Sequence, residues 1–193
     1  KDGGGMYGSA FSSPILTDLH GTRQVVVQTR SRLAGVSLGD GSVLWSQDVP
    51  AFRGMNIMTP TRSGKGFFAS TYGGGSKFYE IQKKGSEFST VERWRTTMQG
   101  YMSSPVVVDG HAYLHLRNQR LTCVRLRDGA DTWTTRTRFG KYMSMVTDGE
   151  RILALDAGGT LFLFRADPEK YELLDSKKVS DDSTWGHLAI SGD

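Results

Sequence analysis

The sequence contains very little cysteine, with only Cys123 in 193 residues. A single cysteine excludes an intrachain disulfide, a zinc site built from several cysteines and a Cys-x-x-Cys redox motif. Because Cys123 lies between Thr122 and Val124 in a run that reads as a strand, we interpret it as a packed, inert thiol. The chain also lacks a run of 18 apolar residues, so the sequence predicts no transmembrane segment.

The sequence also shows little helical periodicity, few prolines and a small net charge. Nothing resembles an amphipathic helix of more than a few turns, only 5 prolines are present, and the formal net charge is +4. Residues 1–5 lack the apolar region of a signal peptide. This last absence carries little weight, because the chain begins and ends inside a repeat and a leader can lie upstream.

What the sequence does contain is glycine, 24 residues of it, between short runs of aromatic and β-branched residues. This pattern is typical of all-β proteins. The stretch 102–138 shows the unit most clearly: the apolar run 106–108 ends at Asp109-Gly110, a pair that favours a tight hairpin. Two alternating runs and a fourth short strand follow, at 112–117, 121–126 and 131–134. The sequence therefore predicts a meander of four antiparallel strands.

This unit recurs along the chain. Ser13-Pro14, Thr59-Pro60 and Ser104-Pro105 lie 46 and 45 residues apart, and further copies begin near Ser144 and Gly186. A period of 40 to 50 residues indicates a propeller or an array. We predict one domain, 1–193, with repeats at about 12–48, 58–97, 103–138 and 143–179, plus the first strand of a further repeat at 185–193. Residues 1–11 read as the tail or linker of a preceding blade.

A tryptophan follows each of the three proline-containing starts, at Trp45, Trp94 and Trp133, and in the fourth repeat Leu174 holds that place. The segment 35–45 resembles the tryptophan-docking repeat Ala-x-Asp-x-x-Thr-Gly-x-x-x-Trp of PQQ-like β-propellers. These are the quinoprotein-type propellers and their cofactor-free, BamB-like relatives. The matching positions, which the resemblance implies are structural docking residues, are Gly35, Gly41, Trp45, Trp94, Cys123, Gly129 and Trp133. Two positions depart from the pattern. Ser37 and Arg125 replace its Asp, and Asp40 and Asp128 replace its Thr.

The resemblance implies a β-propeller built of four-stranded antiparallel blades. About four blades lie in this chain, and family members commonly have seven or eight. We expect an open arc that belongs to a larger propeller, with the open ends available for self-association. The same resemblance implies a periplasmic or otherwise extracytoplasmic setting.

The catalytic features of PQQ dehydrogenases do not carry over. That family is expected to show adjacent cysteines at the quinone, which a single cysteine cannot supply, and no Asp-x-Asn-x-Asn calcium loop is present. The segment 63–66 lacks the glycine spacing of a phosphate loop. His111 and His115 share a strand, and by alternation we expect both to face outward without forming a metal site. We therefore predict no catalytic, cofactor-binding or metal site, no cofactor, and no enzymatic activity.

The connections before the inner strands remain as a binding surface, because they line one mouth of a propeller channel. They are rich in Met, aromatic residues and Arg, which is the composition of protein-binding patches. An alternative interpretation has the methionines merely packing between blades. The residues that we predict to bind a protein or peptide partner are Arg53, Asn56, Met58, Tyr101, Lys141, Tyr142 and Trp185.

Repeat three also carries a basic cluster, made up of Arg117, Arg120, Arg125, Arg127, Arg136 and Arg138. We interpret it as a solvated blade edge that resists pairing, and we expect no nucleic-acid partner.

Two functions stay open at this point. The first is a non-catalytic propeller scaffold that binds protein or peptide in the cell envelope. The alternative is a propeller module of a larger quinoprotein-like enzyme or sensor, with cofactor or catalytic residues outside this chain. The sequence leaves the partner, the blade number of the parent protein and the oligomeric state undetermined.

Overall fold

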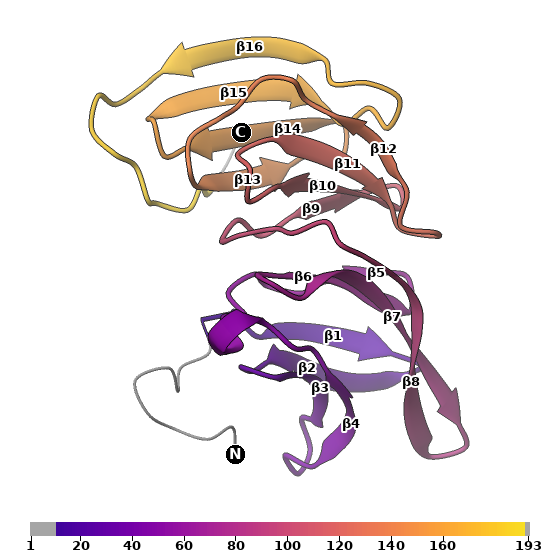
Figure 1. Cartoon of the computed structure of the whole chain (residues 1–193). Helices are drawn as coiled ribbons and strands as arrows, with labels where there is room; N and C mark the ends of the chain where they lie inside the picture. The colour runs from indigo at the N-terminus through magenta and orange to yellow at the C-terminus, as the bar shows by residue number, and fades with distance from the viewer. Residues whose placement is uncertain (1–10, 192–193) are drawn as a thin grey trace. The chain divides into compact units, whose positions relative to one another are not determined.

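The computed structural model describes residues 11–191, which fold into four antiparallel sheets of four strands each (Figure 1). The chain divides into two compact units, 1–100 and 101–193. Each unit contains two of the sheets, and each sheet is one meander in sequence order. The predicted all-β fold of four-stranded propeller blades is thus confirmed. The segment 1–10, interpreted above as a linker, and residues 192–193 lie outside the described residues.

The first unit begins with a blade whose strands follow the period-2 pattern of the sequence. Its strands are β1 (Ile15–Leu19), β2 (Thr22–Gln28), β3 (Arg32–Ser37) and β4 (Val43–Asp48). A short 3-10 turn, η1 (Phe52–Gly54), leads to the second blade. That blade comprises β5 (Thr61–Ser63), β6 (Gly66–Thr71), β7 (Gly75–Lys84) and β8 (Glu87–Thr96). Strands β7 and β8 have ten residues each, which agrees with the longer hairpin expected in repeat two.

The second unit repeats this arrangement. Its first blade comprises β9 (Val106–Val108), β10 (His111–His115), β11 (Leu121–Arg125) and β12 (Asp131–Thr134). Its second comprises β13 (Met143–Thr147), β14 (Arg151–Asp156), β15 (Thr160–Arg165) and β16 (Leu173–Lys178). None of the helical structure between residues 11 and 191 has the length and apolar character needed to cross a membrane.

The turns follow from the residues that were expected to make them. Asp109 and Gly110 both have positive φ, 44° and 73°, which a two-residue hairpin turn between β9 and β10 requires. Gly41 and Gly129 have φ of 73° and 77° and occupy equivalent turns before the fourth strands of their blades. The backbone N–H of each donates to a carbonyl four residues earlier, that of Ser37 or Arg125.

Each unit has its own hydrophobic core, built from both of its blades. In the first unit it includes Leu33 and Trp45 from one blade and Phe67 and Tyr79 from the next. In the second unit it includes Tyr113, Leu121 and Cys123 from one blade and Ile152 and Phe164 from the next. Within each unit, the two blades therefore share one hydrophobic core.

A β-bulge precedes the outer-strand tryptophan position in every blade. Gly35 pairs with Trp45, Phe78 with Trp94 and Cys123 with Trp133, and in each case the register shifts at the next residue. In the fourth blade Leu163 pairs with Asp175, and the shift leaves Leu174 unpaired. The prediction that Leu174 holds the tryptophan's place is therefore wrong by one residue, because spacing along the chain does not reveal a bulge.

Two further expectations differ from the structure. Residues 185–191, expected to start a further repeat, form no strand within the described chain. His115 does not face outward: its side chain is fully buried, as is that of Tyr113 two residues before it. The alternating pattern predicts outward-facing side chains only for a strand with one solvent-exposed face. In β10 the side chains on both faces are buried.

Candidate functional site

Three aromatic side chains from separate connections meet in the second unit, and we call them the aromatic cluster: Tyr101, Tyr142 and Trp185. The rings of Tyr101 and Tyr142 stack with centroids 5.8 Å apart and planes 13° from parallel. The indole of Trp185 lies against Tyr142, with centroids 4.1 Å apart. Tyr101 precedes β9, Tyr142 precedes β13 and Trp185 follows β16, so two inter-strand connections and the segment after β16 form one continuous aromatic surface.

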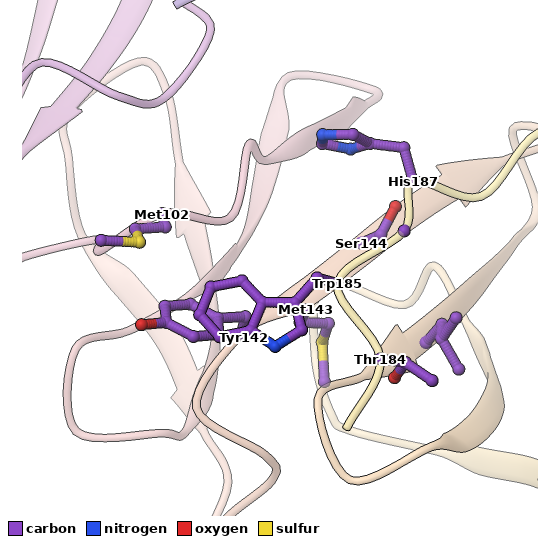
Figure 2. Close-up of a pocket in the computed structure, with 9 residues that line it drawn as sticks. Met102, Tyr142, Met143, Ser144, Thr184, Trp185 and His187 are labelled. Carbon is purple, nitrogen blue, oxygen red and sulfur yellow. The ribbon is translucent and has the colours of Figure 1, made fainter. Parts of the chain in front are cut away.

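The aromatic cluster borders a small cavity of about 150 Å³. Figure 2 shows Tyr142 and Trp185 beside each other there, with Met143 and Thr184 nearby. Met143 is buried, Tyr142 is partly exposed and Trp185 is 65% exposed. A cavity of this size holds a benzene ring when its walls are apolar. The lining here is mixed, with Met143 and Leu155 beside Ser144 and Thr184.

The segment that carries Trp185 is attached to the fourth blade on both sides of the tryptophan. The Thr184 hydroxyl donates to the Asp156 carbonyl at 2.5 Å, and the Leu188 N–H donates to the Ser144 hydroxyl at 2.8 Å. These bonds fix Trp185 in place although most of its surface is exposed. A fixed aromatic group loses little side-chain entropy on binding.

Lys141 adds a positive charge at the rim. Its ammonium lies 5.4 Å from the centroid of the Tyr142 ring. Interaction with the side chain of Tyr142, and then with the charge of Tyr101, raises the pKa of Lys141 above its ordinary value. The rim is therefore cationic at neutral pH.

The structure brings together four of the seven predicted partner-binding residues, Tyr101, Lys141, Tyr142 and Trp185. The other three lie in the first unit. Arg53 is exposed with a φ of 54°, and its guanidinium lies 5.0 Å over the Phe52 ring. Asn56 is fully buried and Met58 is 2% exposed, so neither side chain offers a surface to a partner. Their prediction as binding residues is corrected on this ground.

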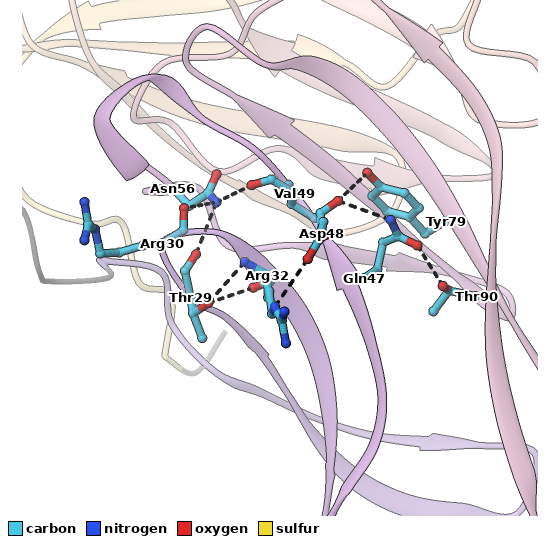
Figure 3. A network of polar contacts seen from close by, with 9 residues as sticks. All are labelled: Thr29, Arg30, Arg32, Gln47, Asp48, Val49, Asn56, Tyr79 and Thr90. Carbon is cyan, nitrogen blue, oxygen red and sulfur yellow. Dashed lines mark hydrogen bonds and ion pairs between the residues drawn. The ribbon is translucent and has the colours of Figure 1, made fainter. Parts of the chain in front are cut away.

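Asn56 instead holds backbone together (Figure 3). Its Nδ2 donates to the carbonyls of Thr29, Arg30 and Val49 at 3.1, 2.9 and 2.9 Å. These carbonyls belong to the β2–β3 turn and the segment after β4. A single amide thus satisfies acceptors on two segments that meet at one end of the first blade.

Replacement of Asn56 with alanine is expected to lower the free energy of unfolding by about 1–3 kcal/mol, because buried carbonyls lose their donor. Chemical denaturation followed by circular dichroism measures the change. Replacement of the exposed Gln82 with alanine is the control, with an expected change within about 0.5 kcal/mol. Equal effects of the two substitutions would contradict the bridging role of Asn56.

Two tryptophans of the resembled docking motif, Trp45 and Trp133, contact the neighbouring blade. The Trp45 indole stacks on Phe67 of the next blade, at 5.8 Å, and its Nε1 donates to Gln24 Oε1 at 2.6 Å. A Cβ built on Gly35 would lie 2.1 Å from Trp45 Nε1, so only glycine fits beneath this ring.

The equivalent tryptophan of the second unit also reaches the neighbouring blade. Trp133 Nε1 donates to the Asp167 carbonyl at 2.9 Å, and its ring meets Tyr171 at 5.8 Å. Cys123, its cross-strand partner, is fully buried, and burial raises the pKa of its thiol. Trp94 stacks on Phe78 within its own blade at 6.1 Å.

His115 is a buried titratable group whose hydrogen-bond partner, Ser103, follows Tyr101 of the aromatic cluster by two residues. The Ser103 hydroxyl lies 3.3 Å from His115 Nδ1 and also accepts the Met143 N–H at 2.9 Å. Burial lowers the pKa of His115 to about 4, although the charge of Asp156 acts in the opposite direction. Among residues 11–191 no three His, Cys, Asp or Glu side chains gather as a metal site.

Sequence reasoning missed part of the cavity wall. Met102, Thr184 and His187 line the cavity but were not chosen as binding residues. All three lie in the connections that were identified as a binding surface. Their position next to Tyr101 or Trp185 was the available signal.

Comparisons with known proteins agree with the fold. A family model described as outer membrane protein assembly factor BamB matches residues 3–135. The crystal structure of BamB from Moraxella catarrhalis is similar with a TM-score of 0.71 at 14% identity, covering 95% of this chain and 54% of that chain. A comparison with curated protein sequences finds no match.

Two other solved structures share the fold. The computationally designed Ika8 protein has a TM-score of 0.62 at 9% identity, covering 92% of this chain and 52% of that one. The N-terminal domain of Nup159 has a TM-score of 0.58 at 13% identity, covering 90% and 46%. The chain thus spans about half the length of the solved structures that it resembles.

Proposed function

This chain belongs to the family of the outer membrane protein assembly factor BamB, and from that premise we propose that it is a non-catalytic propeller module that binds a protein or peptide partner. The family's description as an assembly factor supports a partner that is itself a protein. The same membership supports a location in the cell envelope, outside the cytoplasm.

The observation that carries the proposal is the aromatic cluster with its cavity. Tyr101, Tyr142 and Trp185 present a continuous stacked surface, and Trp185 remains 65% exposed while its flanking residues are anchored. Aromatic residues at a concave site supply most of the binding energy in many protein interfaces. We propose that an extended segment of the partner inserts one apolar side chain into the cavity and stacks along the cluster.

The positive charge of Lys141 at the rim favours a partner segment that carries a negative charge. Lys141 is exposed and cationic beside the aromatic cluster. An acidic residue next to the inserted apolar side chain would meet this charge. Such a rim contact adds specificity and association rate more than affinity.

Truncation of Tyr142 to alanine is expected to weaken partner binding by about thirty-fold, equivalent to about 2 kcal/mol, because the ring contacts both other members of the cluster. A tagged chain is used to recover partners from envelope extract, and the affinity for the recovered protein is then measured by titration calorimetry.

The matched control is Leu173→Ala, which removes an exposed apolar side chain from β16 of the same unit. We expect its affinity to equal that of the wild type. If Leu173→Ala weakens binding while Tyr142→Ala does not, the partner uses the outer blade edge and the proposal is wrong.

A further inference from the structure

A second cavity, of about 420 Å³, lies in the first unit. Its wall includes the three glycines Gly73–Gly75, which end the β6–β7 turn and begin β7. It also includes Lys77 from β7, Arg95 from β8 and Gln99 from the segment after β8. The volume falls within the range of small-molecule sites. None of these residues belongs to the aromatic cluster or to the docking motif.

Lys77 is the unusual member of this wall. It is only 7% exposed, and no hydrogen bond or ion pair joins its ammonium to another residue of 11–191. Strand register places it directly opposite Arg95 on β8. Like charges directly opposite each other in an antiparallel pair are destabilising. A lysine that is almost fully buried is rare unless it is paired.

The nearby carboxylate of Glu92 does not neutralise the charge of Lys77. Glu92 forms an ion pair with Arg95, which leaves one positive charge in excess beside the cavity. Burial lowers the pKa of Lys77, the charge of Glu92 acts against this, and Arg95 reinforces it. The fold therefore keeps an ammonium where its charged form is disfavoured, and an anion in the cavity would stabilise that form.

The glycine loop shapes the opposite wall through close backbone contacts. A Cβ at Gly74 would lie 2.1 Å from the Pro50 carbonyl oxygen, and one at Gly75 would lie 2.2 Å from the Thr96 carbonyl oxygen. The loop is held in place by Gln99, whose Oε1 accepts the Gly73 N–H at 3.2 Å. Within residues 11–191 the Gln99 NH2 group, on a residue of the wall, has no acceptor.

We propose that this cavity binds the carboxylate group of a ligand, with Lys77 as the principal charge partner and Gln99 and Arg95 as hydrogen-bond donors. One excess positive charge matches one carboxylate. A phosphate monoester carries about −1.5 to −2 charges at neutral pH and would leave the site negative. The guanidinium of Arg95 offers the planar geometry that suits a carboxylate.

Titration of the isotopically labelled chain with sodium acetate, at constant ionic strength, tests the assignment. We expect saturable shifts of the Gly73, Gly74 and Gly75 amide signals in NMR spectra, and a rise in the pKa of Lys77 followed at its side-chain carbon. The variant Lys77→Met retains the apolar stem, and its affinity for acetate is expected to be weaker by about ten-fold or more.

Lys65→Met, which removes an exposed lysine of the same unit, is the control and should bind acetate as the wild type does. Three results would overturn the proposal: shifts that sodium chloride reproduces, equal acetate affinity of Lys77→Met and wild type, or tighter binding of inorganic phosphate than of acetate. If Lys77→Met fails to fold, the wild-type pKa of Lys77 decides, because an unchanged value in acetate also overturns the proposal. None of these measurements depends on the partner of the aromatic cluster.

Discussion

Replacement of Trp45 with alanine is expected to lower the free energy of unfolding of the chain by about 3–5 kcal/mol, the cost of removing a large buried aromatic side chain. Trp45 is 4% exposed and covers Gly35, against which no larger residue fits. It also contacts Phe67 of the next blade, and its loss would leave the buried Gln24 Oε1 without its donor. Denaturant unfolding followed by circular dichroism gives the change.

Trp185→Ala provides the matched control, because it removes the same side chain from a site that is 65% exposed. We expect Trp185→Ala to change the unfolding free energy by less than about 0.5 kcal/mol, as for other surface positions. Similar losses of unfolding free energy for the two variants would contradict the distinction between Trp45, which stabilises the fold, and Trp185, which belongs to the aromatic cluster.

Acidification is expected to destabilise the second unit through His115. The folded-state pKa of about 4 lies below the ordinary value of 6.5, so the unfolded state binds more protons between these values. The stabilisation is therefore fully present above about pH 6.5 and is lost as pH falls to about 4. The shift corresponds to about 3 kcal/mol. Unfolding free energies measured across this range give the slope.

Carboxylates as a class also titrate in this range, so a matched variant is needed to isolate the histidine. His115→Gln keeps a polar side chain without a titrating group. Its stability should fall less between pH 7 and pH 4 than that of the wild type, by about the same 3 kcal/mol. Parallel pH profiles of the two proteins would show that His115 is not the source of the dependence.

The repeat pattern predicted most of the fold because each strand is bounded by its own turn residues. Asp109-Gly110 marks a hairpin by its backbone preference alone, and the structure has positive φ at both residues. The tryptophan spacing located Trp45, Trp94 and Trp133 opposite the third strands of their blades. It failed at Leu174, because a bulge changes the register without changing the composition.

Burial of polar residues was much harder to predict. Alternation placed His115 outside, because the pattern does not show that side chains on both faces of β10 are buried. Asn56 was predicted as a partner-binding residue because it lies in a connection between blades. Its side chain is instead buried, where it donates to three backbone carbonyls distant in sequence. Lys77 was not predicted as a site residue. It stands out only once the strand register is known, because the register places it directly opposite Arg95.

The aromatic cluster was predicted from position rather than from any motif. Tyr101, Tyr142 and Trp185 each follow or precede a blade strand, and connections of this kind meet at one end of neighbouring blades. Their stacking could not be derived from the sequence, since it depends on how Thr184 and Leu188 fix the last segment to the fourth blade.

Site-specific photo-crosslinking tests the central claim most directly. A benzophenone amino acid is placed at position 142, at position 185 or at position 173, and the chain is irradiated in envelope extract. We expect positions 142 and 185 to capture the same protein, and we expect position 173, on the outer strand β16, not to capture it. Capture of that protein from position 173 alone, or of no protein from positions 142 and 185, would contradict the central claim.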